Sequence, residues 1–209
     1  MSAPVVVGVL ALQGGVAEHV GLLKGLGAEV RLARRAADLA GLDALVLPGG
    51  ESSTMSRLLV TLGLLGPLRD AAASGLPVLG TCAGLILLAR EVLDPAPGQV
   101  TLGVLDVIVR RNAFGPQVES AEVDLPTSLG PTRVAFIRAP QLVSVGEGVE
   151  VLARLGESVV AVRQGPVVGL AFHPELTGDP TFHADLLRRA SKARSAADSP
   201  STRRAWLSC

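Results

Sequence analysis

Residues 77–85 have the sequence PVLGTCAGL, in which an apolar run leads through a Gly-x-Cys-x-Gly turn into a second apolar segment. A strand that turns sharply into a helix in this way is called a nucleophile elbow, because it raises the central side chain above the end of a sheet. Small residues are needed on either side, where the strand and helix backbones approach closely. The stretch therefore predicts a strand, a tight turn and a helix, with Cys82 as a candidate nucleophile.

Two features of this turn favour cysteine chemistry. The start of the following helix lies beside the sulfur and favours the thiolate form. The backbone N–H of Ala83, directly after the cysteine, is free to stabilise an oxyanion. The alternative is a buried structural cysteine, which is common among free cysteines.

The first half of the chain alternates strand-like and helical segments around this turn. Strands are predicted at residues 5–12, 29–32, 43–47 and 77–80, and helices at residues 16–26, 54–65 and 83–92. Continuous apolar runs such as 5–12 are typical of parallel strands that are buried on both faces. This alternation predicts a doubly wound, mostly parallel α/β sheet flanked by helices.

The second half is richer in short strands. They are predicted at residues 103–109, 118–123, 133–137, 151–155, 159–163 and 167–172, as antiparallel hairpins added to the sheet, and a helix is predicted at 180–190. We expect one domain over residues 1–190. Residues 191–209 are rich in Ser, Ala and Arg and are expected to form a disordered tail. A basic tail that binds a partner or nucleic acid is the alternative.

Composition excludes several classes of protein. The 209 residues carry 19 Lys and Arg against 19 Asp and Glu, so no overall charge favours nucleic acid or an anionic membrane. The apolar runs are shorter than the roughly 18 residues that indicate a membrane span. Cys82 and Cys209 are the two cysteines, too few for a disulfide scaffold. With three His and no CxxC motif, we expect no metal site, and a cytoplasmic protein with free thiols.

A cysteine nucleophile needs a base, and His19, His173 and His183 are the candidates. His173 ends an apolar strand, and the proline after it favours extended backbone there. Glu175, two residues on, would then face the same side and could orient the imidazole. The alternative is a turn histidine beside a solvated Glu175. For His19 and His183 we expect ordinary packing or surface roles.

Residues 45–53, LVLPGGESS, form a third segment that suits a binding site. A strand runs into the turn Gly49-Gly50, where backbone N–H groups can approach a ligand closely. Such a turn can bind an anion or complete an oxyanion hole. It lacks the Gly-Lys-Ser/Thr ending of a phosphate-binding Walker loop. A simple tight turn is the alternative.

Together these segments resemble the class I glutamine amidotransferases, and more narrowly the glutaminase subunits of pyridoxal 5′-phosphate synthase. The general likeness lies in GTCAG at 80–84, PGGES at 48–52 and FHPE at 172–175. The narrower one lies in LQG at 12–14, RNAFG at 111–115, IRAP at 137–140 and HPELT at 173–177. The resemblance covers about residues 5–190, and the tail has no counterpart in it.

The resemblance implies a role for each matched residue. Cys82 would be the nucleophile, His173 the general base and acid, and Glu175 the residue that orients His173. The residues implied to hold glutamine are Gly50, Glu51, Ser52, Arg111, Ile137 and Arg138. Gln13, together with Gly49 and Ala83, would lie at the oxyanion region, and Gln13 also at a partner interface.

The implied activity is hydrolysis of L-glutamine, with ammonia passing to a (β/α)₈-barrel synthase that makes pyridoxal phosphate. No metal or cofactor of the chain's own is implied. Three alternatives stay open: the glutaminase of another pathway, such as imidazole glycerol phosphate synthesis; a catalytically silent regulatory subunit; and a cysteine hydrolase or thiol-redox protein of the same fold. An amino-acid clamp formed by residues 49–52 and Arg111 argues against the redox protein.

Overall fold

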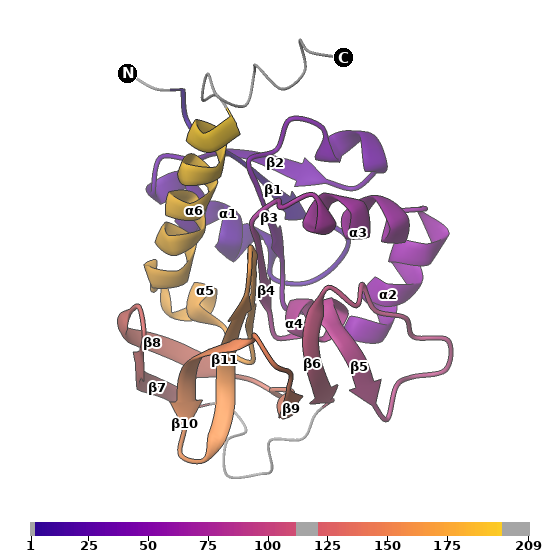
Figure 1. Cartoon of the computed structure of the whole chain (residues 1–209), viewed down its shortest axis with the longest axis vertical. Coiled ribbons are helices and arrows are strands. Elements are labelled where there is room, and N and C mark those ends of the chain that lie inside the picture. The colour runs from indigo at the N-terminus through magenta and orange to yellow at the C-terminus, as the bar shows by residue number, and fades with distance from the viewer. Residues whose placement is uncertain (1–2, 112–120, 198–209) are drawn as a thin grey trace.

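The computed structural model describes residues 3–111 and 121–197, and over these residues the chain forms a nine-stranded sheet with a three-stranded sheet beside it (Figure 1). The strand order of the large sheet is β2-β1-β3-β4-β12-β11-β10-β7-β8, and that of the small one is β5-β6-β9. The large sheet comprises β1 (Val6–Leu10), β2 (Glu29–Ala33), β3 (Ala44–Leu47), β4 (Val78–Thr81), β7 (Ala121–Thr127), β8 (Gly130–Phe136), β10 (Glu150–Leu155), β11 (Ser158–Gln164) and β12 (Val167–Leu170). The small sheet comprises β5 (Ala89–Leu93), β6 (Leu105–Arg110) and β9 (Gln141–Val145).

The large sheet changes from parallel to antiparallel pairing along its width. Strands β2, β1, β3, β4 and β12 are parallel to their neighbours in that series, whereas β11, β10, β7 and β8 continue the sheet in antiparallel pairs. The predicted doubly wound α/β fold with added antiparallel strands is confirmed. One placement was not predicted: β12 pairs antiparallel with β11 but also parallel with β4, with Leu170 opposite Thr81.

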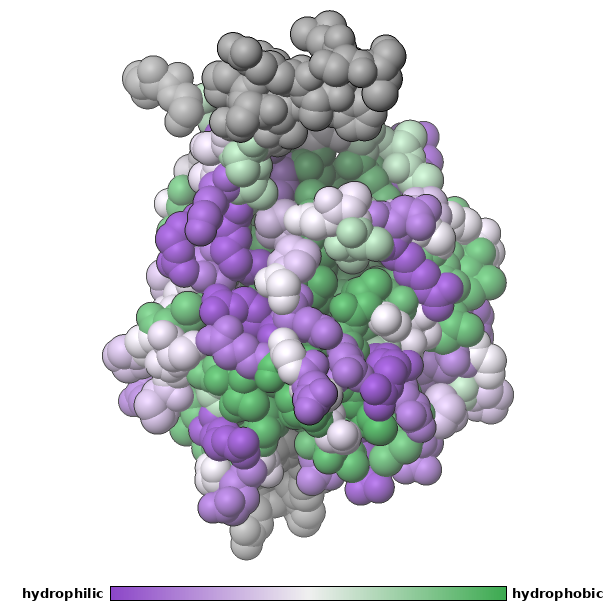
Figure 2. All heavy atoms as spheres, viewed as in Figure 1, coloured by the Kyte–Doolittle hydropathy of each residue, from purple (hydrophilic) through white to green (hydrophobic). Residues whose placement is uncertain are grey.

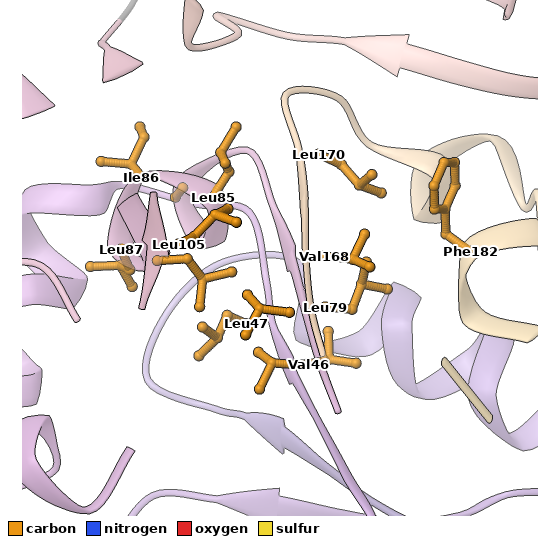
Figure 3. Close-up of a cluster of buried hydrophobic side chains, with 14 of the residues drawn as sticks. Val46, Leu47, Leu79, Leu85, Ile86, Leu87, Leu105, Val168, Leu170 and Phe182 are labelled. Carbon is orange, nitrogen blue, oxygen red and sulfur yellow. The ribbon is translucent and has the colours of Figure 1, made fainter. Parts of the chain in front are cut away.

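Helices cover both faces of the sheet. They are α1 (Val16–Gly25), α2 (Ser52–Thr61), α3 (Leu65–Ala73), α4 (Ala83–Leu88), α5 (Pro174–Thr177) and α6 (Thr181–Ala197), with a 3₁₀ helix η1 (Ala36–Leu39). Figure 1 shows α1 and α6 on one side of the sheet and α2 and α3 on the other. Figure 3 shows Leu79 and Val168 of the central strands between Leu85 of α4 and Phe182 of α6. All four are buried, so this apolar layer holds the central strands and two helices together.

The structure differs from the sequence prediction at two helices and at one strand that was missed. The predicted helix 54–65 is two helices, since Gly63 has a φ of +65° and ends the run between α2 and α3. The predicted helix 83–92 ends at Leu88, where the chain enters β5 and pairs with β6. Strand β9 was not expected. At β5 and β9, pairing with β6 overrides an apolar pattern that suits helix and strand alike.

The final helix continues beyond its predicted end. Residues 191–197 are helical, although a disordered tail was expected from residue 191. Arg194 explains the extension, because its guanidinium donates to the carbonyl oxygens of Ala3 and Pro4 and pairs with Asp43 at 3.1 Å. These contacts hold the last turns of α6 to the start of the chain. The remainder of the predicted tail, 198–209, lies outside the described residues.

Polar and apolar side chains are interspersed over the face that Figure 2 shows, as is usual for a globular protein. Among residues 3–111 and 121–197, no helix has the length and apolar composition that crossing a membrane requires.

Two glycines allow α4 to lie directly against the sheet. A Cβ atom on Gly84 would lie 2.0 Å from the carbonyl oxygen of Leu47 in β3. A Cβ atom on Gly80 would lie 2.7 Å from the carbonyl carbon of Gly84. Both obstacles are backbone atoms, which cannot rotate away as a side chain can. The close approach of strand and helix that the sequence predicted is therefore a property of these two positions.

We predict that Gly84→Ala lowers the free energy of unfolding by about 3 kcal/mol, because the added methyl forces α4 away from β3. Gly21→Ala is the matched control, since Gly21 lies in α1 and an added Cβ meets nothing within 4 Å. That change should raise the free energy of unfolding by up to about 1 kcal/mol through helix propensity. Urea unfolding of both variants measures the difference, and similar midpoints would contradict the close approach.

Candidate active site

The candidate nucleophile sits on a strained turn. Cys82 lies between the end of β4 and the start of α4, with φ 46° and ψ −99°. A positive φ is unusual for a residue other than glycine and is commonly found at functional sites. The side chain is 6% exposed, and its amide donates to the Leu170 carbonyl oxygen at 2.8 Å. Ala83 begins α4, so its N–H is one of those without a partner inside the helix.

His173 lies beside this turn because β12 is parallel to β4. Its backbone is extended, with φ −120° and ψ 91°, and it forms an isolated bridge with Ala135 just after β12 ends. Nδ1 of the ring lies 2.7 Å from Oε1 of Glu175. An ionised carboxylate only accepts hydrogen bonds, so Nδ1 carries the proton and Nε2 is left for chemistry at Cys82. Glu175 reaches the ring from the first turn of α5, and not from the extended segment that was expected.

Electrostatics in this buried trio favour charge separation. Burial by itself lowers the pKa of His173, but hydrogen bonding and charge interactions with Cys82 and Glu175 raise it to about 10. Burial also favours the neutral form of Glu175. Hydrogen bonding and charge interactions with His173 and His19 nevertheless hold the pKa of this carboxyl well below its usual range. The arrangement therefore suits an imidazolium that is stabilised by a carboxylate on one side and lies beside Cys82 on the other.

The glycine turn after β3 packs against the same histidine. A Cβ atom on Gly49 would lie 2.2 Å from Cε1 of His173. The Gly49 carbonyl accepts from the Gly15 amide at 3.0 Å, and Gln13 Oε1 accepts from the Glu51 amide at 2.7 Å. The ends of β1, β3 and β12 are thus bonded or packed to one another. Gln13 thus contacts the glycine turn and Gly49 contacts His173, and their place at an oxyanion stays a prediction.

A pocket opens at these strand ends. It is lined by Gly50, Glu51, Ser52, Cys82, Ile86, Arg111, Ile137, Arg138 and His173. The structure thus gathers the predicted nucleophile, the predicted base and the residues predicted to hold a substrate around one space. Their roles stay predictions. Residues 112, 114 and 115 of the RNAFG motif lie outside the described residues.

One side of the pocket carries an ion pair that suits an amino acid. Nη2 of Arg111 lies 3.0 Å from Oε1 of Glu51. Burial by itself raises the pKa of Glu51. Hydrogen bonds from the Ser53 hydroxyl and the Thr54 amide outweigh that effect and lower the pKa to about 2. Glu51 is therefore ionised at neutral pH. A guanidinium and a carboxylate side by side can bind the α-carboxylate and the α-ammonium of a free amino acid.

Gln99 supports this ion pair and was missed by the sequence analysis. Its Oε1 accepts from Arg111 at 2.9 Å, and its Nε2 donates to the Ser52 hydroxyl at 3.2 Å. It lies between β5 and β6, in a stretch with no motif, so no local signal marked it.

The two other histidines were also underestimated. His19 and His183 are fully buried, so the surface alternative is wrong for both. Nδ1 of His19 lies 2.8 Å from Nε2 of His183, and Nε2 of His19 lies 3.2 Å from the Thr81 hydroxyl. The sequence places each of them in a helix, but it does not show which residues of other elements that helix packs against. In the part of the chain that the structure describes, no group of three or more His, Cys, Asp or Glu is placed to hold a metal.

Fold and site together define a class. A cysteine at an elbow in a doubly wound sheet, a histidine with a carboxylate on Nδ1, and an amino-acid-sized charge pair are the parts of a cysteine-dependent amide hydrolase. Comparison with known proteins narrows the class. Residues 9–192 match the model of the SNO glutamine amidotransferase family. This chain belongs to that family.

Individual relatives agree with the family match. A protein of Parafrankia sp. named pyridoxal 5′-phosphate synthase subunit PdxT is 59% identical over 186 residues, covering 88% of this chain and 91% of its own. A protein of Frankia alni with the same name is 54% identical over 200 residues, covering 93% and 100%. A crystal structure described as a glutamine amidotransferase is 51% identical with a TM-score of 0.84, covering 88% of this chain and 98% of its own.

Burial of His183 gives the fold a specific dependence on pH. Burial and the nearby His19 lower the pKa of His183 to about 3, against smaller raising effects of Glu175 and Asp179. The unfolded chain therefore takes up a proton near pH 6.5 that the folded chain refuses until about pH 3. The free energy of unfolding should fall as pH drops below 6.5, by up to about 1.4 kcal/mol per pH unit.

The window from pH 4.5 to 6.5 isolates this effect from the triad. The raised pKa of His173 adds stability that is fully present below pH 6.5, and the lowered pKa of Glu175 adds stability that is lost only below pH 4.5. We predict that His183→Asn flattens the pH dependence of the free energy of unfolding in this window. Urea unfolding at several pH values measures it, and parallel curves for the two proteins would contradict it.

Proposed function

We propose that this chain hydrolyses L-glutamine to glutamate and ammonia through Cys82, His173 and Glu175, and supplies the ammonia to a pyridoxal 5′-phosphate synthase partner. The observation that carries the proposal is the single pocket that joins the Cys82 thiol and His173 to the Arg111–Glu51 ion pair. Family membership and the names of the relatives support both the reaction and the pathway.

Substrate binding uses the charge pair. Arg111 pairs with the α-carboxylate of glutamine and Glu51 accepts from its α-ammonium, while Gln99 holds the guanidinium in place. Backbone at Gly50 and Ser52, and at Ile137 and Arg138 on the opposite wall, encloses the rest of the molecule. With its α-groups held, the side-chain amide of glutamine extends toward Cys82.

Chemistry then follows in two halves. The Cys82 thiolate attacks the amide carbon, and the N–H groups of Ala83 and of the Gly49–Gly50 peptide donate to the oxyanion. Because the Gly49 carbonyl is held by Gly15, the N–H of the same trans peptide points the opposite way. His173 donates its proton to the departing nitrogen, and ammonia and a thioester result. Water attacks the thioester, His173 takes a proton from it, and glutamate leaves as the thiolate is restored.

Family membership also supports a proposal for the partner and the compartment. We infer that the synthase subunit is the (β/α)₈ barrel implied by the sequence resemblance and that it consumes the ammonia in building pyridoxal phosphate from a pentose phosphate and a triose phosphate. Gln13, at the end of β1 and bonded to Glu51, lies where a docked partner would influence the pocket. A cytoplasmic location suits a nucleophile that must remain a free thiol.

We predict that Cys82→Ala abolishes ammonia release from glutamine while the far-UV circular dichroism spectrum stays that of the wild type. The reason is that, of the described residues lining the pocket, Cys82 is the only cysteine, and His173 lines the same pocket beside it. Ammonia is measured with and without the purified synthase subunit. Cys209→Ser is the control and should retain wild-type turnover. Ammonia release by Cys82→Ala with the partner present would show that the assignment of the nucleophile is wrong.

We predict that Arg111→Ala raises KM for glutamine at least tenfold and changes kcat much less, because the guanidinium binds a part of the substrate that does not react. The neighbouring Arg110→Ala is the matched control, since Arg110 is exposed and faces Asp94 at 3.7 Å instead of the pocket. Steady-state kinetics with the synthase subunit present measure both variants. Equal KM values for the two variants would remove Arg111 from the binding site.

A further inference from the structure

A pair of buried histidines lies behind the triad and has no part in the steps above. His19 comes from α1 and His183 from α6, and both side chains are inaccessible to solvent. Their rings are 5.1 Å apart between centroids, and the Nδ1 to Nε2 contact of 2.8 Å joins them directly. Burying two imidazoles removes them from water, which is costly unless their nitrogens find partners. The partners that they have are therefore informative.

The free end of this pair points at the triad carboxylate. Nε2 of His19 lies 3.4 Å from Oε1 of Glu175 and 3.2 Å from the Thr81 hydroxyl. The same hydroxyl lies 3.4 Å from the same carboxylate oxygen. Thr81 is the residue before Cys82, so the contact also touches the turn that carries the nucleophile.

The direction of these hydrogen bonds follows from chemistry. The ionised carboxylate of Glu175 can only accept, so the Nε2 atom of His19 that faces it carries a proton. The Thr81 hydroxyl can accept from His19 and donate to Glu175 at once. The contact with His183 leaves the other nitrogen of His19 occupied and holds the ring in the plane that aims Nε2 at the carboxylate.

Glu175 depends on these contacts because of how it is held. Its Oε2 atom is buried and has no hydrogen-bond partner among the described residues. The polar contacts of its side chain are made through Oε1: hydrogen bonds with His173 at 2.7 Å and Thr81 at 3.4 Å, and an ion-pair approach of His19 Nε2 at 3.4 Å. Without His19 and Thr81, Glu175 would be held only by His173, which is the ring it has to orient. A group outside the catalytic set is therefore needed to define where the carboxylate lies.

We propose that His19 is a positioning residue for glutamine hydrolysis, which holds Glu175 through Nε2 and is itself held by His183. The proposal rests on the hydrolysis proposed above and extends it to α1 and α6. His19 touches neither substrate nor the reacting atoms, so it acts on the rate only by fixing the carboxylate and, through it, the imidazole of His173.

The test is a double-mutant cycle in the complex of the full chain with its synthase subunit. His19→Leu removes the donor at similar size, and Glu175→Ala removes the group that it positions. With glutamine saturating, His19→Leu should lower kcat at least tenfold in the wild-type background and leave KM within twofold. In the Glu175→Ala background the same change should lower kcat less than threefold, because nothing is left to position.

Leu23→Val is the matched control for simple destabilisation. Leu23 is fully buried in the same helix, one turn after His19. It should lower the unfolding midpoint without changing kcat in either background. A kcat for His19→Leu within twofold of wild type, or an equal loss of kcat with and without Glu175, would overturn the proposal.

A second pair of variants keeps the test decisive if His19→Leu does not fold. The amide nitrogen of His19→Gln can reach the position of Nε2, whereas that of His19→Asn reaches only the position of Nδ1. We expect kcat of the Gln variant to exceed that of the Asn variant at least fivefold, and equal values would overturn the proposal. If the wild-type complex itself released no ammonia from glutamine, the proposed function would fail and this inference with it. Wild-type turnover with unaffected His19 variants would refute the inference alone.

Discussion

The hydrogen bond from the Cys82 amide to the Leu170 carbonyl joins β4 to β12 at their carboxyl ends, and the site depends on this pairing. Neighbouring strands lie just under 5 Å apart, so the residues that leave two adjacent strands emerge side by side. Cys82 leaves β4 into a helix and His173 leaves β12 into a short helical turn. Were β12 paired with β11 alone, as a simple hairpin, the histidine would have no defined distance from the thiol.

Rigidity at this edge comes from backbone contacts more than from side chains. The carbonyl groups of Leu47 and Gly49 occupy the spaces that a Cβ atom on Gly84 or on Gly14 would need. Three strand ends and one helix therefore meet at van der Waals distance. The strained φ of Cys82 is maintained because the elements on both sides of it are fixed in this way.

The two carboxylates of the site, Glu51 and Glu175, lie in different environments. Glu51 and Arg111 pair at the pocket wall, partly exposed, where an incoming amino acid can exchange their contact for its own charges. Glu175 is buried beneath His173 and away from solvent, where a charge is tolerated only with donors around it. The outer pair therefore suits recognition, and the inner carboxylate suits orientation and stabilisation of an imidazolium.

Local sequence was sufficient for much of this molecule. Three elements can be recognised from about ten consecutive residues each: the elbow around Cys82, the glycine turn before Glu51 and the strand leading to His173. This is possible because turn chemistry and strand periodicity are short-range properties. The parallel α/β class followed from their alternation. The same rules misplaced the end of the helix after Cys82 and missed β9, since apolar runs of that length suit helix and strand alike.

Tertiary structure alone placed β12 next to β4, Gln99 on Arg111, and His19 with His183 behind Glu175. Hydrogen bonds at the site join residues that are far apart in the chain. The separation is 12 residues for Gln99–Arg111, 94 for Thr81–Glu175 and 164 for His19–His183. No local pattern encodes such contacts, because the partner of each side chain depends on which other element packs against it. A buried histidine in a helix has the same sequence signature whether it packs against leucine or donates to a catalytic carboxylate, and the packing of α1 and α6 against the sheet determines which.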